Sequence, residues 1–216
     1  MSTASHPFAA EPFSAGADVR VSDLACRYGL RPVFDGVSFE LKAGAALALY
    51  GANGSGKTSL LRIMAGLMPP VAGHIDPAPS PRDVHYLGHM DGLKPLLTVG
   101  ETLAMLAGFY GVKSYGRSDL LLLLGLQTHE SQRVGDLSAG QKRRLSLARL
   151  ILAPRPLWLL DEPLTALDKT GRSLISELAA GHLAAQGMIL AASHEQLDFA
   201  TASLSLDGSA DDQGAS

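Results

Sequence analysis

A run of eight residues has the composition and spacing of a phosphate-binding loop. In order they are Gly51, Ala52, Asn53, Gly54, Ser55, Gly56, Lys57 and Thr58. Glycines let the backbone curl so that successive N–H groups face one anion, and a helix starting here adds its partial positive charge. The run matches the Walker A motif, in which lysine reaches the β- and γ-phosphates and the final hydroxyl ligates Mg²⁺. We therefore expect ATP to bind here, beside Ser59 as well, and Thr58 to ligate Mg²⁺; a glycine-rich turn with a solvated lysine is the alternative.

A second chemical group is a pair of carboxylates, Asp161 and Glu162, directly after the apolar residues 157–160. Adjacent carboxylates repel each other unless a cation lies between them. Mg²⁺ is such a cation, and it neutralises charge that develops on transferring phosphoryl groups. We expect Asp161 to hold Mg²⁺ and Glu162 to orient or deprotonate the attacking water. In isolation such a pair before Pro163 is more often an exposed turn, but a Walker A loop upstream favours catalysis.

A third segment offers another anion-binding helix start. It consists of Leu137, Ser138, Ala139, Gly140 and Gln141. Here the chain resembles the ABC ATPases, whose LSGGQ signature has glycine where this chain has Ala139. The resemblance implies a homodimer in which ATP lies between the loop 51–58 of one subunit and Ser138, Ala139, Gly140 and Gln141 of the other. An ordinary serine-capped helix start is the alternative.

Three further residues have counterparts in the ABC family, in the expected order along the chain. Asp168, after Ala166 and Leu167, resembles the D-loop aspartate, which crosses the dimer interface. His194 follows an apolar stretch and resembles the switch histidine that contacts the γ-phosphate, so we expect it to act in catalysis with Lys57. Tyr28 resembles the aromatic residue that stacks on adenine, although a tyrosine at a strand end is also commonplace.

One position departs from the family pattern. Most ABC ATPases have a glutamine, the Q-loop residue, at a set spacing before a Leu-Thr-Val stretch. In this chain that spacing from residues 97–99 leads back to His89. Each imidazole tautomer has one donor and one acceptor nitrogen, so it replaces an amide imperfectly. Whether His89 contacts Mg²⁺ or water as the glutamine would is left open.

A narrower resemblance comes from residues 88–94, together with Leu-Ser-Ala-Gly-Gln-Lys-Arg-Arg at 137–144 and the segment 160–168. These segments resemble the CcmA family, the ATP-binding subunits of the haem exporter of cytochrome c maturation. The resemblance implies membrane permease partners similar to CcmB and CcmC, and a place at the cytoplasmic face of the bacterial inner membrane. It implies haem as the cargo of the complex, but we do not expect His74, His85 or His89 to bind haem.

Composition excludes several other classes. The chain has 216 residues, 46% of them hydrophobic, and a net charge of −3, without the basic excess of a nucleic-acid binder. Its single cysteine, Cys26, is expected to be a small strand hydrophobe in a reducing compartment. Residues 1–17 lack the pattern of a signal peptide, and no apolar run reaches the roughly 18 residues of a spanning helix. Any work at a membrane is therefore expected to depend on partners.

Hydrophobic periodicity predicts the elements that position these groups. Alternation predicts strands at 19–28 and 33–41, and continuous apolar runs predict buried strands at 45–50, 157–160 and 188–192. A further short strand is expected at 84–87. Helical spacing predicts helices at 56–67, 99–110, 118–126, 141–152 and 169–185. The fold class is then α/β: a P-loop ABC domain at 18–206 with a parallel core, an antiparallel flanking sheet and a helical subdomain inserted at about 95–136. Residues 1–17 and 207–216 are expected to be disordered.

Two alternative functions are open at this stage. One is the ATPase subunit of another small ABC exporter. The other is a soluble ABC ATPase of DNA repair or translation, but such proteins usually carry two cassettes, coiled-coil inserts or basic arms, which this sequence lacks. A P-loop kinase would lack the signature and the second carboxylate.

Overall fold

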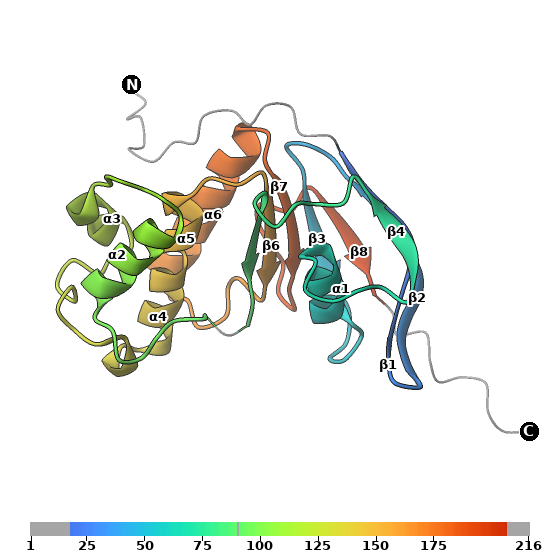
Figure 1. Cartoon of the computed structure of the whole chain (residues 1–216), viewed down its shortest axis with the longest axis horizontal. Helices are drawn as coiled ribbons and strands as arrows, with labels where there is room; N and C mark the ends of the chain where they lie inside the picture. Colours follow the sequence, from blue (N-terminus) through green and yellow to red (C-terminus); the bar gives the residue numbers. More distant parts are fainter. Residues whose placement is uncertain (1–17, 90, 207–216) are drawn as a thin grey trace, which may run out of the picture.

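A computed structural model describes residues 18–89 and 91–206. Both predicted disordered segments, 1–17 and 207–216, lie outside the described residues. Figure 1 shows a central parallel sheet with an antiparallel sheet on one side and a group of helices on the other. The predicted fold class is confirmed.

The central sheet has five parallel strands in the order β5-β6-β7-β3-β8. Their bounds are β3 (Ala46–Tyr50), β5 (Val84–Leu87), β6 (Leu157–Asp161), β7 (Met188–Ala192) and β8 (Ala202–Ser205). The loop after β3 and the acidic pair at the end of β6 lie at the same edge, because the carboxyl ends of parallel strands meet there. β7 stands between these two strands.

Burial on both faces explains why β3, β6 and β7 are continuous apolar runs. Successive side chains of a strand point to opposite faces. Ala46 and Ala48 of β3 therefore join one core cluster with the helical side, while Leu47 and Leu49 join a second cluster beneath the antiparallel sheet. Strands covered on both faces need apolar residues at every position.

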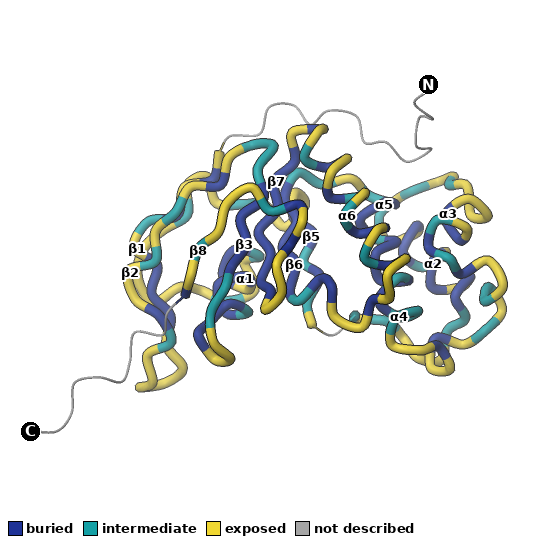
Figure 2. Tube along the Cα trace, turned by 180° about the vertical axis from the view of Figure 1, so that it is seen from behind, coloured by how far each residue is buried: buried dark blue, intermediate teal, exposed yellow. Residues whose placement is uncertain are grey.

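The antiparallel sheet has the order β2-β1-β4. It consists of β1 (Val19–Tyr28), β2 (Arg31–Leu41) and β4 (Ala72–Asp76). Cys26 is buried in β1 as a free thiol, and burial raises its pKa. Sequence periodicity did not predict β4 or β8, because both are short edge strands whose residues are mostly exposed. Figure 2 shows this for β8.

Two helices cover the parallel sheet from opposite sides (Figure 1). α1 (Lys57–Met64) lies between the two sheets, and α6 (Lys169–Ala184) lies on the other face. The prediction that α1 continues to residue 67 was wrong. The helix ends where Gly66 adopts a φ of 68°, a left-handed conformation that glycine reaches without strain and that ends helices.

The remaining helices form the group seen beyond α6 in Figure 1. They are α2 (Val99–Phe109), α3 (Arg117–Leu123), the 3₁₀ turn η1 (Val134–Asp136), α4 (Ala139–Ser146) and α5 (Ala148–Leu152). A capping box between Thr98 and Glu101 begins α2. The single helix predicted at 141–152 is divided at Leu147, where the Ser146 hydroxyl donates to the carbonyl of Arg143 at 2.7 Å. Within residues 18–89 and 91–206, no helix has the length and apolarity to cross a bilayer.

Two buried histidines are structural. His85 on β5 donates from Nε2 to the carbonyl of Ala153, and His182 on α6 stacks on Trp158 with ring centroids 3.9 Å apart. Burial lowers the pKa of each imidazole to about 4, helped at His85 by the guanidinium groups of Arg155 and Arg149. Both rings are therefore neutral in the folded protein at neutral pH.

These histidines predict a loss of stability on mild acidification. In the unfolded chain each histidine takes up a proton as the pH falls below its ordinary pKa of about 6.5. In the folded chain the same two side chains stay neutral until the pH approaches their lowered pKa of about 4. The free energy of unfolding should fall by about 1 kcal/mol for each histidine between pH 7.5 and 5.5. Urea unfolding at several pH values measures this. His85→Gln should reduce the slope and the exposed-site control His74→Gln should keep it; an unchanged slope in His85→Gln would contradict the assignment.

Candidate nucleotide-binding site

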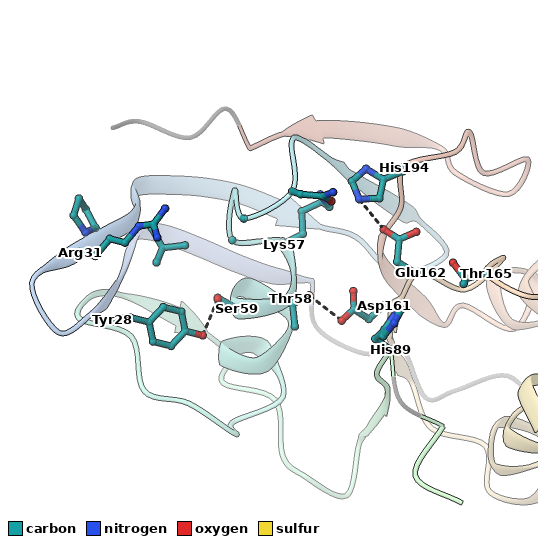
Figure 3. A pocket seen from close by; sticks show the side chains of 15 residues that line it. Tyr28, Arg31, Lys57, Thr58, Ser59, His89, Asp161, Glu162, Thr165 and His194 are labelled. Atoms are coloured by element: carbon teal, nitrogen blue, oxygen red, sulfur yellow. Dashed lines mark hydrogen bonds and ion pairs between the residues drawn. The ribbon is translucent and has the colours of Figure 1, made fainter. Parts of the chain in front are cut away.

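One cavity of about 860 Å³ collects most of the predicted groups. It opens between the loop after β3, the end of β6 and the turn joining β1 to β2 (Figure 3). The predicted residues that line it are Tyr28, Asn53, Gly54, Gly56, Lys57, Thr58, Ser59, His89, Asp161, Glu162 and His194. They come from segments far apart in the sequence, which the sheet order brings together.

The loop geometry requires glycine at two of its positions. Gly51 has a φ of 149°, and a Cβ there would lie 2.5 Å from the carbonyl oxygen of Leu206. Gly56 has a φ of 101°, and a Cβ there would lie 2.7 Å from the side chains of Val33 and Phe34 on β2. Any side chain at either position would displace neighbouring atoms, so the curled backbone of the loop depends on both glycines.

Lys57 and Ser55 have buried polar groups that a bound anion would satisfy. Lys57 is 7% exposed, and its ammonium donates to the carbonyls of Gly51 at 2.7 Å and Ala52 at 3.1 Å. A buried ammonium is costly without a negative partner, and carbonyl oxygens offer only partial charge. The buried Ser55 hydroxyl has no hydrogen-bond partner among the described residues. A phosphate group would satisfy both side chains, so the residues present fit a nucleotide.

The two predicted Mg²⁺ ligands are in direct contact. Thr58 Oγ1 donates to Asp161 Oδ2 at 2.9 Å, which joins the start of α1 to the end of β6 (Figure 3). Asp161 is 3% exposed and faces the cavity. Hydroxyl and carboxylate oxygens are the donors that Mg²⁺ prefers, so the pair fits this ion. When bound, Mg²⁺ would neutralise phosphate charge beside these oxygens.

Glu162 is held in an unusual backbone conformation. Its φ is 50°, in the left-handed region, and its N–H donates to the carbonyl of Ala192 on β7 at 2.9 Å. Its Oε1 lies 3.4 Å from Nε2 of His194, as Figure 3 shows. Non-glycine residues in this conformation concentrate at functional sites, where neighbours hold them against the strain.

His194 is placed by the residues on both sides of it. Ser193 is 1% exposed, donates to the carbonyl of Glu195 at 2.7 Å and accepts from its N–H at 3.0 Å. The Glu195 carboxylate accepts two hydrogen bonds from Arg172 of α6, at 2.6 and 3.0 Å. This short turn directs the imidazole toward Glu162 at the mouth of the cavity.

The far end of the cavity is aromatic. Tyr28 is 52% exposed, and its hydroxyl hydrogen-bonds to Ser59 of α1 at 3.0 Å. The ring thus stands against the cavity with one edge anchored (Figure 3). Arg31, three residues further on β2, lines the same end and was not predicted from the sequence. Its only sequence signal was its closeness to Tyr28.

The predicted signature and D-loop residues lie outside the cavity, and Gly51, Ala52 and Ser55 of the loop are also not among its lining residues. Among the residues that the structure describes, none of Ser138, Ala139, Gly140, Gln141 and Asp168 lines it. Ser138 caps α4 through a capping box with Gln141. Asp168 caps α6 by accepting from Gly171 at 2.8 Å.

The signature and the D-loop touch each other within one chain. A Cβ on Gly140 would lie 2.7 Å from the carbonyl oxygen of Ala166, whose own φ is 64°. Thr165, one residue earlier, lines the cavity and was also missed from the sequence, where only its place between Glu162 and Asp168 marked it. The segment from Glu162 to Asp168 therefore runs from the cavity to the signature helix.

Comparison with known proteins agrees with this geometry. The ABC transporter family matches residues 34–165. A solved ATP-binding subunit of an ABC transporter superposes with a TM-score of 0.78 at 26% identity, covering 89% of this chain and 88% of that one. A putative ABC transporter ATP-binding protein of Pyrococcus furiosus has a TM-score of 0.77 over 88% of this chain and 98% of that one, at 24% identity. The chain belongs to the ABC transporter family and is an ATP-hydrolysing ABC ATPase.

More similar relatives narrow the family. The cytochrome c biogenesis ATP-binding export protein CcmA of Rhodopseudomonas palustris is 47% identical over 184 residues, 82% of this chain and 92% of that protein. CcmA of Bradyrhizobium diazoefficiens is 46% identical over 191 residues, covering 86% and 96%. Within the ABC transporters, the chain belongs to the CcmA proteins.

The aromatic end of the cavity yields a prediction about nucleotide affinity. If the Tyr28 ring stacks on adenine, Tyr28→Ala should weaken binding of a non-hydrolysable ATP analogue about tenfold, since stacking on a base contributes about 1–3 kcal/mol. Tyr28→Phe keeps the ring but loses the hydrogen bond to Ser59, and should change affinity by less than about threefold. Isothermal titration calorimetry measures both. Equal weakening in the two variants would assign the effect to the hydroxyl instead of the ring.

Proposed function

We propose that this chain, as a pair of ATPase subunits at the cytoplasmic face of the bacterial inner membrane, powers haem export or haem release for c-type cytochrome biogenesis. The observation that carries the proposal is the cavity that joins Lys57, Thr58, Asp161 and Glu162. It occurs in a chain that is 46–47% identical to CcmA proteins over most of its length.

Each residue has a chemical task in this proposal. Lys57 and the N–H groups of the loop bind the phosphates of ATP, and Tyr28 holds the base. Thr58 and Asp161 hold Mg²⁺. Glu162 accepts the proton of the attacking water, and His194 beside it contacts the γ-phosphate end. A well-placed general base contributes roughly 10²- to 10⁴-fold in rate.

A second copy of the chain would complete the site. The signature residues 138–141 begin a capped helix that does not line the cavity of its own chain. Ser138 and Ala139 are exposed, so this helix start is free to meet an anion on another subunit. We propose a head-to-tail homodimer in which Asp168 crosses the interface.

The membrane partners would be permease subunits similar to CcmB and CcmC. Haem is then their cargo, and nothing requires this chain to bind it. His85 agrees with this view, because it is 2% exposed and its Nε2 is engaged by Ala153. His89 faces the cavity that we assign to ATP. We propose that His89 replaces the Q-loop glutamine.

Replacing the general base should separate binding from turnover. Glu162→Gln keeps the shape of the side chain and removes the base, so kcat for ATP hydrolysis should fall about 10²- to 10⁴-fold. ATP affinity should hold, and the variant should accumulate as a nucleotide-bound dimer, seen by light scattering. The matched control is Glu177→Gln on the exposed side of α6. Normal phosphate release from Glu162→Gln would remove Glu162 from the mechanism.

The physiological role has its own test in cells. Deletion of the gene should abolish covalently bound haem in c-type cytochromes, detected by haem staining of denaturing gels. A plasmid with the wild-type gene or Glu177→Gln should restore the staining, and one with Glu162→Gln should not, because the complex then lacks ATP turnover. Normal holocytochrome levels in the deletion strain would refute the cytochrome assignment while leaving the ATPase assignment intact.

A further inference from the structure

Arg143, on α4, is a buried arginine whose guanidinium joins three segments around the site. It is 4% exposed. Nη1 donates to the carbonyl of Gly88 and to Oδ1 of Asp91, both at 3.1 Å. Nη2 donates to the carbonyl of Asp161 at 3.0 Å and to that of Glu162 at 2.9 Å. One side chain therefore connects the signature helix to the catalytic end of β6 and to the segment that follows β5.

The chemistry of this cluster requires an arginine. A buried guanidinium is tolerated when its charge is paired and its N–H groups are bonded. The Asp91 side chain, 22% exposed, supplies the paired charge, and both terminal nitrogens of Arg143 are bonded. The buried Nε has no hydrogen-bond partner among the described residues. The planar fork reaches four acceptors in two other segments at once. A lysine ammonium is a compact point charge with three donors, so it cannot hold all four acceptors.

The contact with Glu162 bears directly on catalysis. A non-glycine residue with a φ of 50° carries strain of about 1–3 kcal/mol and keeps its conformation only when its surroundings hold it. The Glu162 N–H donates to the carbonyl of Ala192 on β7, and the Glu162 carbonyl accepts from Arg143 at 2.9 Å and from the N–H of Thr165 at 3.2 Å. Loss of the charged and shorter contact leaves the longer one from Thr165, so the peptide can relax more easily and the carboxylate can change direction.

The contacts on the other side act on His89. Arg143 holds Gly88, the residue before His89, and Asp91 shortly after it. Arg149 of α5 adds a hydrogen bond of 2.6 Å to the carbonyl of Asp91. Arg143 and Arg149, which both follow the signature, thus bind Gly88 and Asp91 on either side of His89. His89 itself lines the cavity.

We infer that Arg143 is a positioning residue for ATP turnover: it aims Glu162 and ties its direction to the signature helix. This inference rests on the proposed ATPase role of Glu162. Arg143 does not itself line the cavity, so it acts through the residues that it holds. Arg143 makes one pair of contacts with Gly88 and Asp91 and another with the carbonyls of Asp161 and Glu162. Through the second pair, the position of α4 and the direction of the Glu162 side chain depend on each other.

The test compares neighbouring arginines in the full chain, co-expressed with its membrane subunits. Arg143→Lys should lower kcat about 10- to 100-fold, because small misplacements of a catalytic group cost that much, and leave the KM for ATP within about threefold. The matched control is Arg144→Lys, since Arg144 donates to the carbonyls of Leu124 and Gly125 in the helical part. That variant should keep kcat within about threefold.

A second readout separates positioning from general destabilisation. Combining Arg143→Lys with Glu162→Gln should lower the single-turnover rate by less than about twofold beyond Glu162→Gln alone, because residues acting as one unit are not additive. A full additional loss in the double variant, a raised KM with kcat unchanged, or equal losses in Arg143→Lys and Arg144→Lys would each overturn the inference.

Asp91→Asn covers the case in which Arg143→Lys does not fold. It weakens the anchor of the guanidinium without changing α4, and should lower kcat about threefold or more at unchanged KM. Unchanged kcat in Asp91→Asn would then overturn the inference. Wild-type protein that fails to turn over ATP would instead refute the proposed function, so the two failures are distinguishable.

Discussion

The burial of the Lys57 ammonium beneath a glycine-built loop is the constraint on which the rest of the structure depends. The lysine is 7% exposed and is bonded to the carbonyls of Gly51 and Ala52, so its charge favours an anion in the cavity. That arrangement needs a strand that ends abruptly, a backbone with φ values of 149° and 101° at two glycines, and a helix that starts at once. The two core clusters on either face of β3 supply the rigidity that keeps this loop curled.

The order of the parallel strands then determines what meets the anion. Because β7 lies beside β3 and β6 lies beside β7, the carboxyl ends of these parallel strands bring Asp161, Glu162 and His194 to the same edge as the loop. Thr58 bonds Asp161 across this edge, and Glu162 approaches His194. Ligands in open α/β sheets bind at the carboxyl ends of strands for this reason. The groups proposed for binding and for turnover therefore share one rigid frame, although Thr58 and Asp161 are more than a hundred residues apart in sequence.

The parts of this frame that the sequence could predict are those with strong local patterns. Continuous apolar runs identified β3, β6 and β7 because burial on both faces leaves no alternation to find. Edge strands β4 and β8 were missed since partial exposure removes that pattern, and the division of α4 from α5 depends on one serine hydroxyl that bonds back to Arg143. Motif spacing named most of the residues lining the cavity. Motif spacing did not identify Arg31 or Thr165, because only the tertiary fold brings their side chains to the cavity.

Arg143 shows the same limit at the level of mechanism. In sequence it is one of three consecutive basic residues, 142–144, which would usually be assigned to a solvated helix face. The fold instead buries its guanidinium at the junction of β6, α4 and the segment after β5, while Arg144 turns to the helical part. In the homodimer proposed above, α4 would meet the second subunit at its start, and it holds the Glu162 peptide through Arg143 about one turn later. The two contacts would then depend on each other. In that proposal, a partner that contacts Ser138 acts on the same helix that holds the proposed base, Glu162. ATP turnover would then depend on the correct placement of the two subunits.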